Sequence, residues 1–180
     1  MPPAPEPEVF TAAVHAHQAM VFSLAWRIVG NREVAEELAQ DVFLSLYQHW
    51  GGLESEAHRR HWLRQVTTRR AIDQLRRQRL RPRLGLDDIA EPVAPTTAAA
   101  DPLLAAQLER WLAALPPRHR AAIVLRYQED LEPADIARLL GRPVHTVKSW
   151  LQRGLAALRR QAQAPASLAP PPEGEHNAAL

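Results

Sequence analysis

The placement of proline constrains the fold of this chain more than any other feature of its sequence. The chain has 180 residues and 16 prolines, most of which crowd into the first seven residues, the stretch 82–102 and the segment beyond residue 164. Proline fixes φ and cannot donate a backbone hydrogen bond, so such clusters neither continue a helix nor join a sheet. They predict a short start, a body, a linker, a second body and a tail.

Helical periodicity fills both bodies. Apolar residues recur at near-helical spacing, which predicts helices over 9–29, 32–50 and 56–81 and then over 103–115 and 118–127. No segment alternates with a period of two, so we predict no sheet. The expected fold is all-α, with two small helical domains joined by a flexible linker. The expected bounds are a disordered start at 1–8, a first domain at 9–82, the linker at 83–102, a second domain at 103–161 and a disordered tail at 162–180.

Charge is segregated within the first domain. From Arg59 to Arg83 ten arginines accompany a single acid, Asp73, whereas the segment 33–41 holds four acids and no base. A solvated helix face usually mixes charges of both signs. The segregation therefore predicts two partners for this domain, one of them a polyanion such as nucleic acid.

The segment 133–160 has the pattern of a helix-turn-helix. Pro133 suits a first helical turn, and Gly141 ends the first helix before an expected four-residue turn. The expected apolar stripe of the second helix is Val144, Val147, Leu151, Leu155 and Leu158. Its outward face is expected to hold His145, Lys148, Ser149, Gln152 and Arg153. Because the second helix of this motif enters the major groove, the pattern favours DNA binding over a pair of merely hydrated helices.

Several function classes find little support in the sequence. The absence of cysteine excludes a disulfide framework and a thiolate metal site. The start lacks a signal-peptide pattern, and every apolar run is far shorter than the about 20 residues that cross a bilayer, so we expect a cytoplasmic protein without direct membrane insertion. The histidine pairs His15/His17 and His58/His61 have no evident third ligand. We predict no catalytic activity, no metal and no cofactor.

Three blocks in a fixed order carry a family resemblance. They read LAWRIVGNREVAEELAQDVFLSLYQHW, WLRQVTTRRAIDQLRRQR and YQEDLEPADIARLLGRPVHTVKSWLQRGLAALRR. With their scaffolds they cover about residues 9–160, and this part of the chain resembles the extracytoplasmic-function sigma factors, the compact two-domain members of the bacterial sigma-70 family. The resemblance implies a factor that carries core RNA polymerase to promoter DNA and catalyses nothing itself. It also implies an anti-sigma factor as a further partner.

The resemblance assigns functional residues as well. The family's pattern for binding core polymerase falls on Glu36, Glu37, Gln40, Asp41 and Phe43. Its block for the promoter −10 element falls on Trp62, Arg69, Arg70, Asp73, Arg76 and Arg77. Its recognition helix for the −35 element falls on His145, Thr146, Lys148, Ser149, Gln152 and Arg153. The resemblance further implies that the −10 DNA is melted and that one base enters a pocket near Trp50–Arg59.

Three positions depart from the family pattern. Thr68-Arg69 stands where the family often has Arg-Asn, which affects the contacts of the −10 helix. Trp150 replaces a common arginine, so either a phosphate contact is missing or an indole packs there. Gly154 replaces a usual alanine and should cost its helix roughly 1 kcal/mol.

Two other functions stay open on the sequence alone. A stand-alone helix-turn-helix regulator would bind DNA without polymerase, but it leaves the acidic segment 33–41 without a role. A metal-dependent hydrolase would use the histidines, but it lacks a ligand set.

Overall fold

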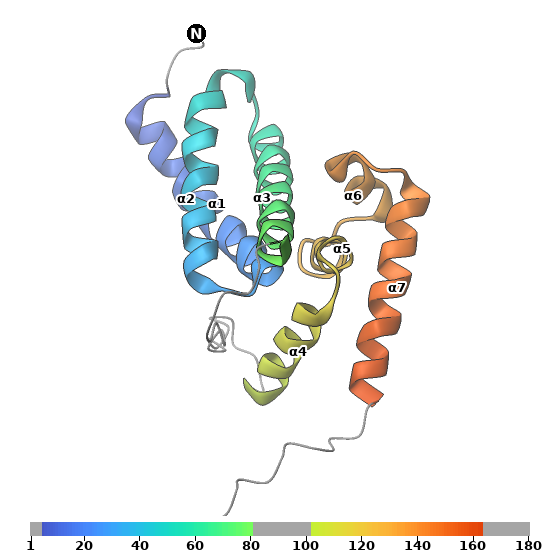
Figure 1. Ribbon diagram of the computed structural model, residues 1–180. Helices are drawn as coiled ribbons and strands as arrows, with labels where there is room; N and C mark the ends of the chain where they lie inside the picture. The colour runs from blue at the N-terminus through green and yellow to red at the C-terminus, as the bar shows by residue number, and fades with distance from the viewer. Residues whose placement is uncertain (1–4, 81–101, 164–180) are drawn as a thin grey trace, which may run out of the picture.

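The computed structural model describes residues 5–80 and 102–163, and this part of the chain is helical with no strand. The elements are α1 (Pro7–Val29), α2 (Arg32–His49), the 3₁₀ turn η1 (Trp50–Gly52), α3 (Glu56–Leu80), α4 (Pro102–Ala114), α5 (Pro117–Tyr127), α6 (Pro133–Leu140) and α7 (Val144–Gln163). The prediction of an all-α fold is confirmed. Helices α1–α3 form one group and α4–α7 a second (Figure 1).

Proline sets the first residue of four helices. Pro7, Pro102, Pro117 and Pro133 each begin a helix, because the first N–H of a helix has no partner within it and nothing is lost when proline removes that group. Residues 7–8 are therefore helical, although we expected them in a disordered start. Pro102 likewise begins α4 instead of ending the linker. The rest of the expected linker, 83–101, lies outside the described residues.

The helix ends follow the local sequence, with two differences from expectation. Gly30 ends α1 and Gly141 ends α6, both in the left-handed region at φ of 75° and 62°. The turn between α6 and α7 has three residues, 141–143, whereas we expected four. Helix α7 also continues to Gln163, two residues into the expected tail. The remainder of that tail, 164–180, lies outside the described residues.

A single hydrophobic core runs through both groups of helices. Buried residues of all seven described helices belong to it, among them Leu24 of α1, Leu63 of α3, Leu125 of α5 and Val147 of α7. Helix α5 lies between α3 and α7 and contacts both (Figure 1). The two domains are therefore packed against each other, which the sequence analysis did not anticipate.

Candidate polymerase and nucleic-acid interfaces

The acidic residues of α2 lie on its exposed side. Val42 and Leu46 are fully buried and fix which face of the helix points inward. The exposed residues of the predicted polymerase-binding set are Glu36, Glu37, Gln40 and Asp41, and Phe43 is half-buried. Arg32 donates a hydrogen bond to Glu36 at 2.8 Å, but both side chains remain about half exposed, so solvent screens this pair strongly. This face of α2 is free to meet a partner.

An open apolar groove of about 1110 Å³ lies between α1 and α2. Its lining includes Phe10, Phe22, Phe43, Leu44 and Tyr47, and also the polar residues Glu36 and Gln40. Leu44 is 64% exposed and Tyr47 is 46% exposed, which is unusual for large apolar side chains on a packed helix. We did not include these two residues among the candidates. The signal in the sequence was that both are large apolar residues that lie outside the buried stripe of α2.

The basic residues of α3 do not all face the same way. Arg69, Asp73, Arg76 and Arg77 are exposed, whereas Trp62 is half-buried against the ring of His49. Arg70 turns toward α2, where it donates to Ser45 Oγ at 2.6 Å and lies 3.7 Å from Asp41. One residue predicted for the −10 element therefore contacts one predicted for polymerase.

The structure shows where the side chains of Thr68 and Arg69 lie, at the position that departs from the family pattern. Thr68 is fully buried, as is Thr67 before it, so neither side chain lies on the surface. Of the pair, only Arg69 is available to contact DNA. Thr68 therefore adds nothing to the exposed basic face of α3.

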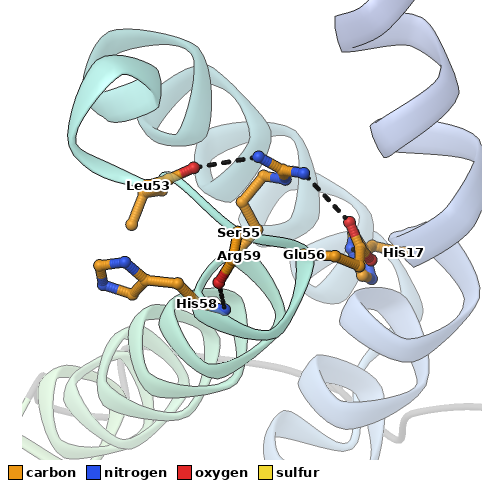
Figure 2. A network of polar contacts seen from close by, with 6 residues as sticks. All are labelled: His17, Leu53, Ser55, Glu56, His58 and Arg59. Atoms are coloured by element: carbon orange, nitrogen blue, oxygen red, sulfur yellow. Dashed lines mark hydrogen bonds and ion pairs between the residues drawn. The ribbon is translucent and has the colours of Figure 1, made fainter.

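A polar network holds the turn that leads into α3, near the expected pocket at Trp50–Arg59 (Figure 2). The backbone N–H of His58 donates to Ser55 Oγ at 3.1 Å, which satisfies one of the free N–H groups of the first turn. Arg59 donates to the carbonyl of Leu53 at 3.0 Å, and its guanidinium lies 5.0 Å from the centre of the Trp50 ring. These contacts fix the position of η1 relative to α3.

The same network reaches α1 through Glu56. Its carboxylate accepts a hydrogen bond from Arg59 at 3.5 Å, and it lies 2.7 Å from Nε2 of the buried His17 (Figure 2). His17, one of the histidines considered as a metal ligand, is therefore occupied by a carboxylate. Among residues 5–80 and 102–163, no three histidine, aspartate or glutamate side chains are grouped to hold a metal ion.

Helices α6 and α7 form a helix-turn-helix. Ile136 and Leu139 of α6 are buried, as are Val147 and Leu151 of α7. Leu155 and Leu158 are half-buried. Val144 is 40% exposed, so its expected place in the buried stripe is wrong. It is the first residue of α7, directly after the turn. On the outward side, His145, Lys148, Gln152 and Arg153 are exposed, and Thr146 and Ser149 are half-buried.

The other two departures are explained by packing. Trp150 is half-buried, and the guanidinium of Arg118 lies 5.9 Å from the centre of its ring, so an indole packs where the family has arginine. Gly154 is buried where α7 crosses α5, and a Cβ there would lie 3.0 Å from Cγ1 of Ile123. Glycine is therefore used for close approach of the helices. This close approach is a packing reason for glycine that stands beside its expected cost to the helix.

Comparisons with known proteins identify the family of this chain. Two family models match the chain, "Sigma-70 region 2" over residues 13–81 and "Sigma-70, region 4" over residues 105–158. The ECF RNA polymerase sigma factor SigM of Mycobacterium tuberculosis is 33% identical over 151 residues, which is 84% of this chain and 76% of the relative. SigW of Bacillus subtilis, with the same description, is 28% identical over 168 residues, 86% of this chain and 89% of the relative.

The chain belongs to the ECF sigma factors of the sigma-70 family. It has sigma factor activity in promoter-specific transcription initiation. The matching families are those of a transcription regulator, and no catalytic family is among them.

A solved structure shares the fold of this sigma factor. The sigma factor RpoE of Bartonella quintana, solved in complex with the anti-sigma factor NepR, aligns with a TM-score of 0.72 and 18% identity, over 88% of this chain and 99% of that one. None of the described helices is long and apolar enough to cross a membrane.

Proposed function

We propose that this sigma factor uses three separate surfaces in transcription initiation, each for a different binding partner. The α1–α2 groove and the acidic face of α2 bind core RNA polymerase. The exposed arginines of α3 contact the −10 element, and the outward face of α7 reads the −35 element. The observation that carries the proposal is the groove itself, which is apolar and open and has the carboxylate of Glu36 in its lining. The exposed arginines of α3 and the exposed Lys148 and Arg153 of α7 lie outside it.

The groove has the composition of a protein-binding site. Exposed apolar patches of this kind mark interaction surfaces, and aromatic side chains such as Phe43 and Tyr47 are the usual anchors. The carboxylates of Glu37 and Asp41 beside it favour a basic partner surface and exclude nucleic acid. Core polymerase is the partner that the family gives to this face.

The two DNA surfaces differ in what they offer. Arg69, Arg76 and Arg77 on α3 are exposed cations, which suit phosphates and require no particular base. We place the extruded base of the −10 element near Trp50, where Arg59 already covers the indole ring. Few aromatic residues lie on α3, so stacking on melted DNA is weak and promoter choice should be strict.

The division into domains follows the three surfaces. Residues 9–82 would bind polymerase and the −10 element, and residues 103–161 would bind the −35 element. Two linked modules gain affinity because the second binding step occurs at high effective concentration. We also propose an anti-sigma factor as a partner, which is supported by the NepR-bound state of the Bartonella quintana relative.

Reconstituted transcription tests the proposal directly. Core polymerase with this protein should give transcripts from a discrete set of promoters in a genomic template library, and core polymerase alone should not. A stand-alone regulator would instead bind DNA and fail to pull down core polymerase. That outcome would replace the proposed function with the alternative.

A further inference from the structure

A small cleft lies where α3 faces the turn between α6 and α7, and its volume is about 330 Å³. Four arginines from three parts of the chain line it: Arg69, Arg76, Arg118 and Arg142. The first two belong to α3, the third to α5 and the fourth to the turn. A volume near 300 Å³ is at the lower end of the range for small-molecule sites, so the cleft suits one compact ligand.

The lining of the cleft has a large excess of positive charge. Asp73 is the one acid among the described residues that line it, against four arginines, which leaves an excess of three positive charges. Asp73 lies 3.8 Å from Arg76, but both side chains are more than half exposed, so solvent weakens this pair. Within residues 5–80 and 102–163, none of the other three arginines takes part in an ion pair.

The cations of the two walls are close to each other. A Cβ on Gly141, the residue before Arg142, would lie 3.7 Å from Nη2 of Arg69. Guanidinium groups gathered in this way repel one another, and an anion between them removes the repulsion. A cleft lined by one sign of charge also raises the local concentration of ions of the opposite sign. Because the planar guanidinium pairs with phosphate through two parallel hydrogen bonds, phosphate is the anion that four arginines suit best.

An aromatic surface lies beside these cations. Trp150 lines the cleft and is half-buried, and the guanidinium of Arg118 lies 5.9 Å from the centre of its ring. Indole rings and guanidinium planes are the surfaces on which nucleic bases stack. The carboxylate of Asp73 can accept a hydrogen bond from a sugar hydroxyl. The cleft thus offers a partner for each part of a nucleotide.

We propose that this cleft binds a nucleoside diphosphate, with the phosphates on Arg69, Arg76 and Arg142 and the base against Trp150 and Arg118. Charge favours this class: a diphosphate ester carries about three negative charges when its terminal phosphate is fully ionised, which equals the excess in the lining. The site goes beyond the proposed function. It shares two arginines of α3 with the proposed −10 surface, whereas the other three residues belong to no proposed DNA surface.

Calorimetric titration of the full chain tests the site. ADP and GDP are both used, because stacking on an aromatic ring accepts any base. We expect one molecule of the tighter ligand to bind per chain, and no measurable binding of adenosine, which lacks the phosphates. No binding of either diphosphate, or equal binding of adenosine, would overturn the proposal.

Two arginine variants locate the phosphates without changing the proposed DNA surfaces. Arg142→Gln and Arg118→Gln should each weaken binding of the tighter diphosphate by at least about tenfold, the effect of losing one charge-assisted hydrogen bond. The matched control is Arg110→Gln, which removes the same charge at an exposed position of α4 outside the cleft. It should bind as the wild type does. Equal weakening in all three variants would show a general attraction of anions and no site.

The indole is tested separately from the cations. Trp150→Leu should weaken binding of the nucleoside diphosphate by at least about fivefold and leave binding of inorganic pyrophosphate unchanged, because only the nucleotide has a base to stack. Trp150→Phe keeps an aromatic ring and should restore most of the affinity. If Trp150→Leu weakened both ligands equally, the indole would only support the walls of the cleft, and the assignment to a nucleotide would be wrong.

Thermal unfolding shows whether the variants stay folded. A ligand that binds only the folded chain raises Tm. The nucleoside diphosphate should therefore raise Tm of the wild type and of Arg110→Gln, and raise it much less in Arg142→Gln, while all three have the same Tm without ligand. An equal rise in Arg142→Gln would place the ligand elsewhere on the molecule and overturn the proposal.

Discussion

We propose that side chains on the outward face of α7 discriminate between bases. Gln152 and Arg153 are exposed one helical turn beyond Lys148 and Ser149, so all four can face one groove. A side chain that reads a base edge contributes about 1–3 kcal/mol of discrimination. One that touches only phosphate adds affinity without sequence preference.

This difference predicts that variants of α7 and variants of α3 will change DNA binding in different ways. Gln152→Ala and Arg153→Ala should relax preference within the −35 sequence by about 1–3 kcal/mol per contact. Arg76→Ala and Arg77→Ala should weaken binding evenly across sequences and reduce the salt slope by about one unit each. The measurement is holoenzyme binding to −35 variants at two salt concentrations. Equal losses on all −35 sequences for the α7 variants would mean that this helix positions the protein without reading bases.

At the scale of a helix, the polymerase-binding function proposed for α2 depends on one whole face of it. Asp41→Arg reverses a charge on the acidic side and places a cation beside Arg70, and Phe43→Ala removes an aromatic wall of the groove. Both should weaken binding to core polymerase by at least about tenfold, the effect of losing one interface anchor. A competition assay against a labelled sigma factor measures this.

The control for α2 is a carboxylate outside the groove. Glu8→Arg on α1 makes the same reversal at an exposed position that does not line it. Circular dichroism should show the same helix content in all three variants. If Asp41→Arg and Phe43→Ala compete as well as Glu8→Arg, α2 has no part in binding polymerase.

The contact between α5 and α7 predicts a dependence of stability on pH. His119 lies half-buried on α5, and burial, with Arg153 as a lesser cause, lowers its pKa below the ordinary 6.5. The His119 ring therefore takes up a proton at a higher pH in the unfolded chain than in the folded chain. The free energy of unfolding should therefore fall as the pH decreases through and below 6.5.

Urea denaturation of the wild type and of His119→Gln checks the direction of this pH dependence. Between about pH 7.5 and about pH 5.5 the wild type should lose more stability than the variant, because the other histidines are common to both. The variant removes only this titration. Parallel pH profiles would show that His119 is protonated equally in the folded and unfolded chains.

At the scale of the whole molecule, the proposed function requires both DNA surfaces to engage the promoter together. Inserting about five base pairs between the −10 and −35 elements rotates one relative to the other by half a helical turn. Transcription should fall by at least about tenfold, because the gain from effective concentration is lost when the geometry forbids both contacts. Insertion of a single base pair is the matched control. Unchanged transcription with the longer spacer would mean that one domain suffices.

The sequence by itself determined the elements and their outward faces. Helix starts at Pro117 and Pro133, helix ends at Gly30 and Gly141, and the outward face of α7 all depend on residues within a few positions of each other. Proline at a first turn and glycine in a left-handed cap act locally, so these features were predictable to within a few residues. The order of the three motif blocks then predicted which helices carry the polymerase and DNA surfaces.

Only the tertiary structure decided how these faces meet. Arg118 and Arg120 are two residues apart on α5 and alike in the sequence, yet Arg118 is exposed beside Trp150 and Arg120 is 3% exposed where the two domains meet. The carbonyl that accepts from Arg120 lies 93 positions away, in α1. Periodicity shows which side of a helix is apolar, but it contains no information about a partner so distant. Whether an arginine binds DNA or holds two domains together depends on which surface is packed against it.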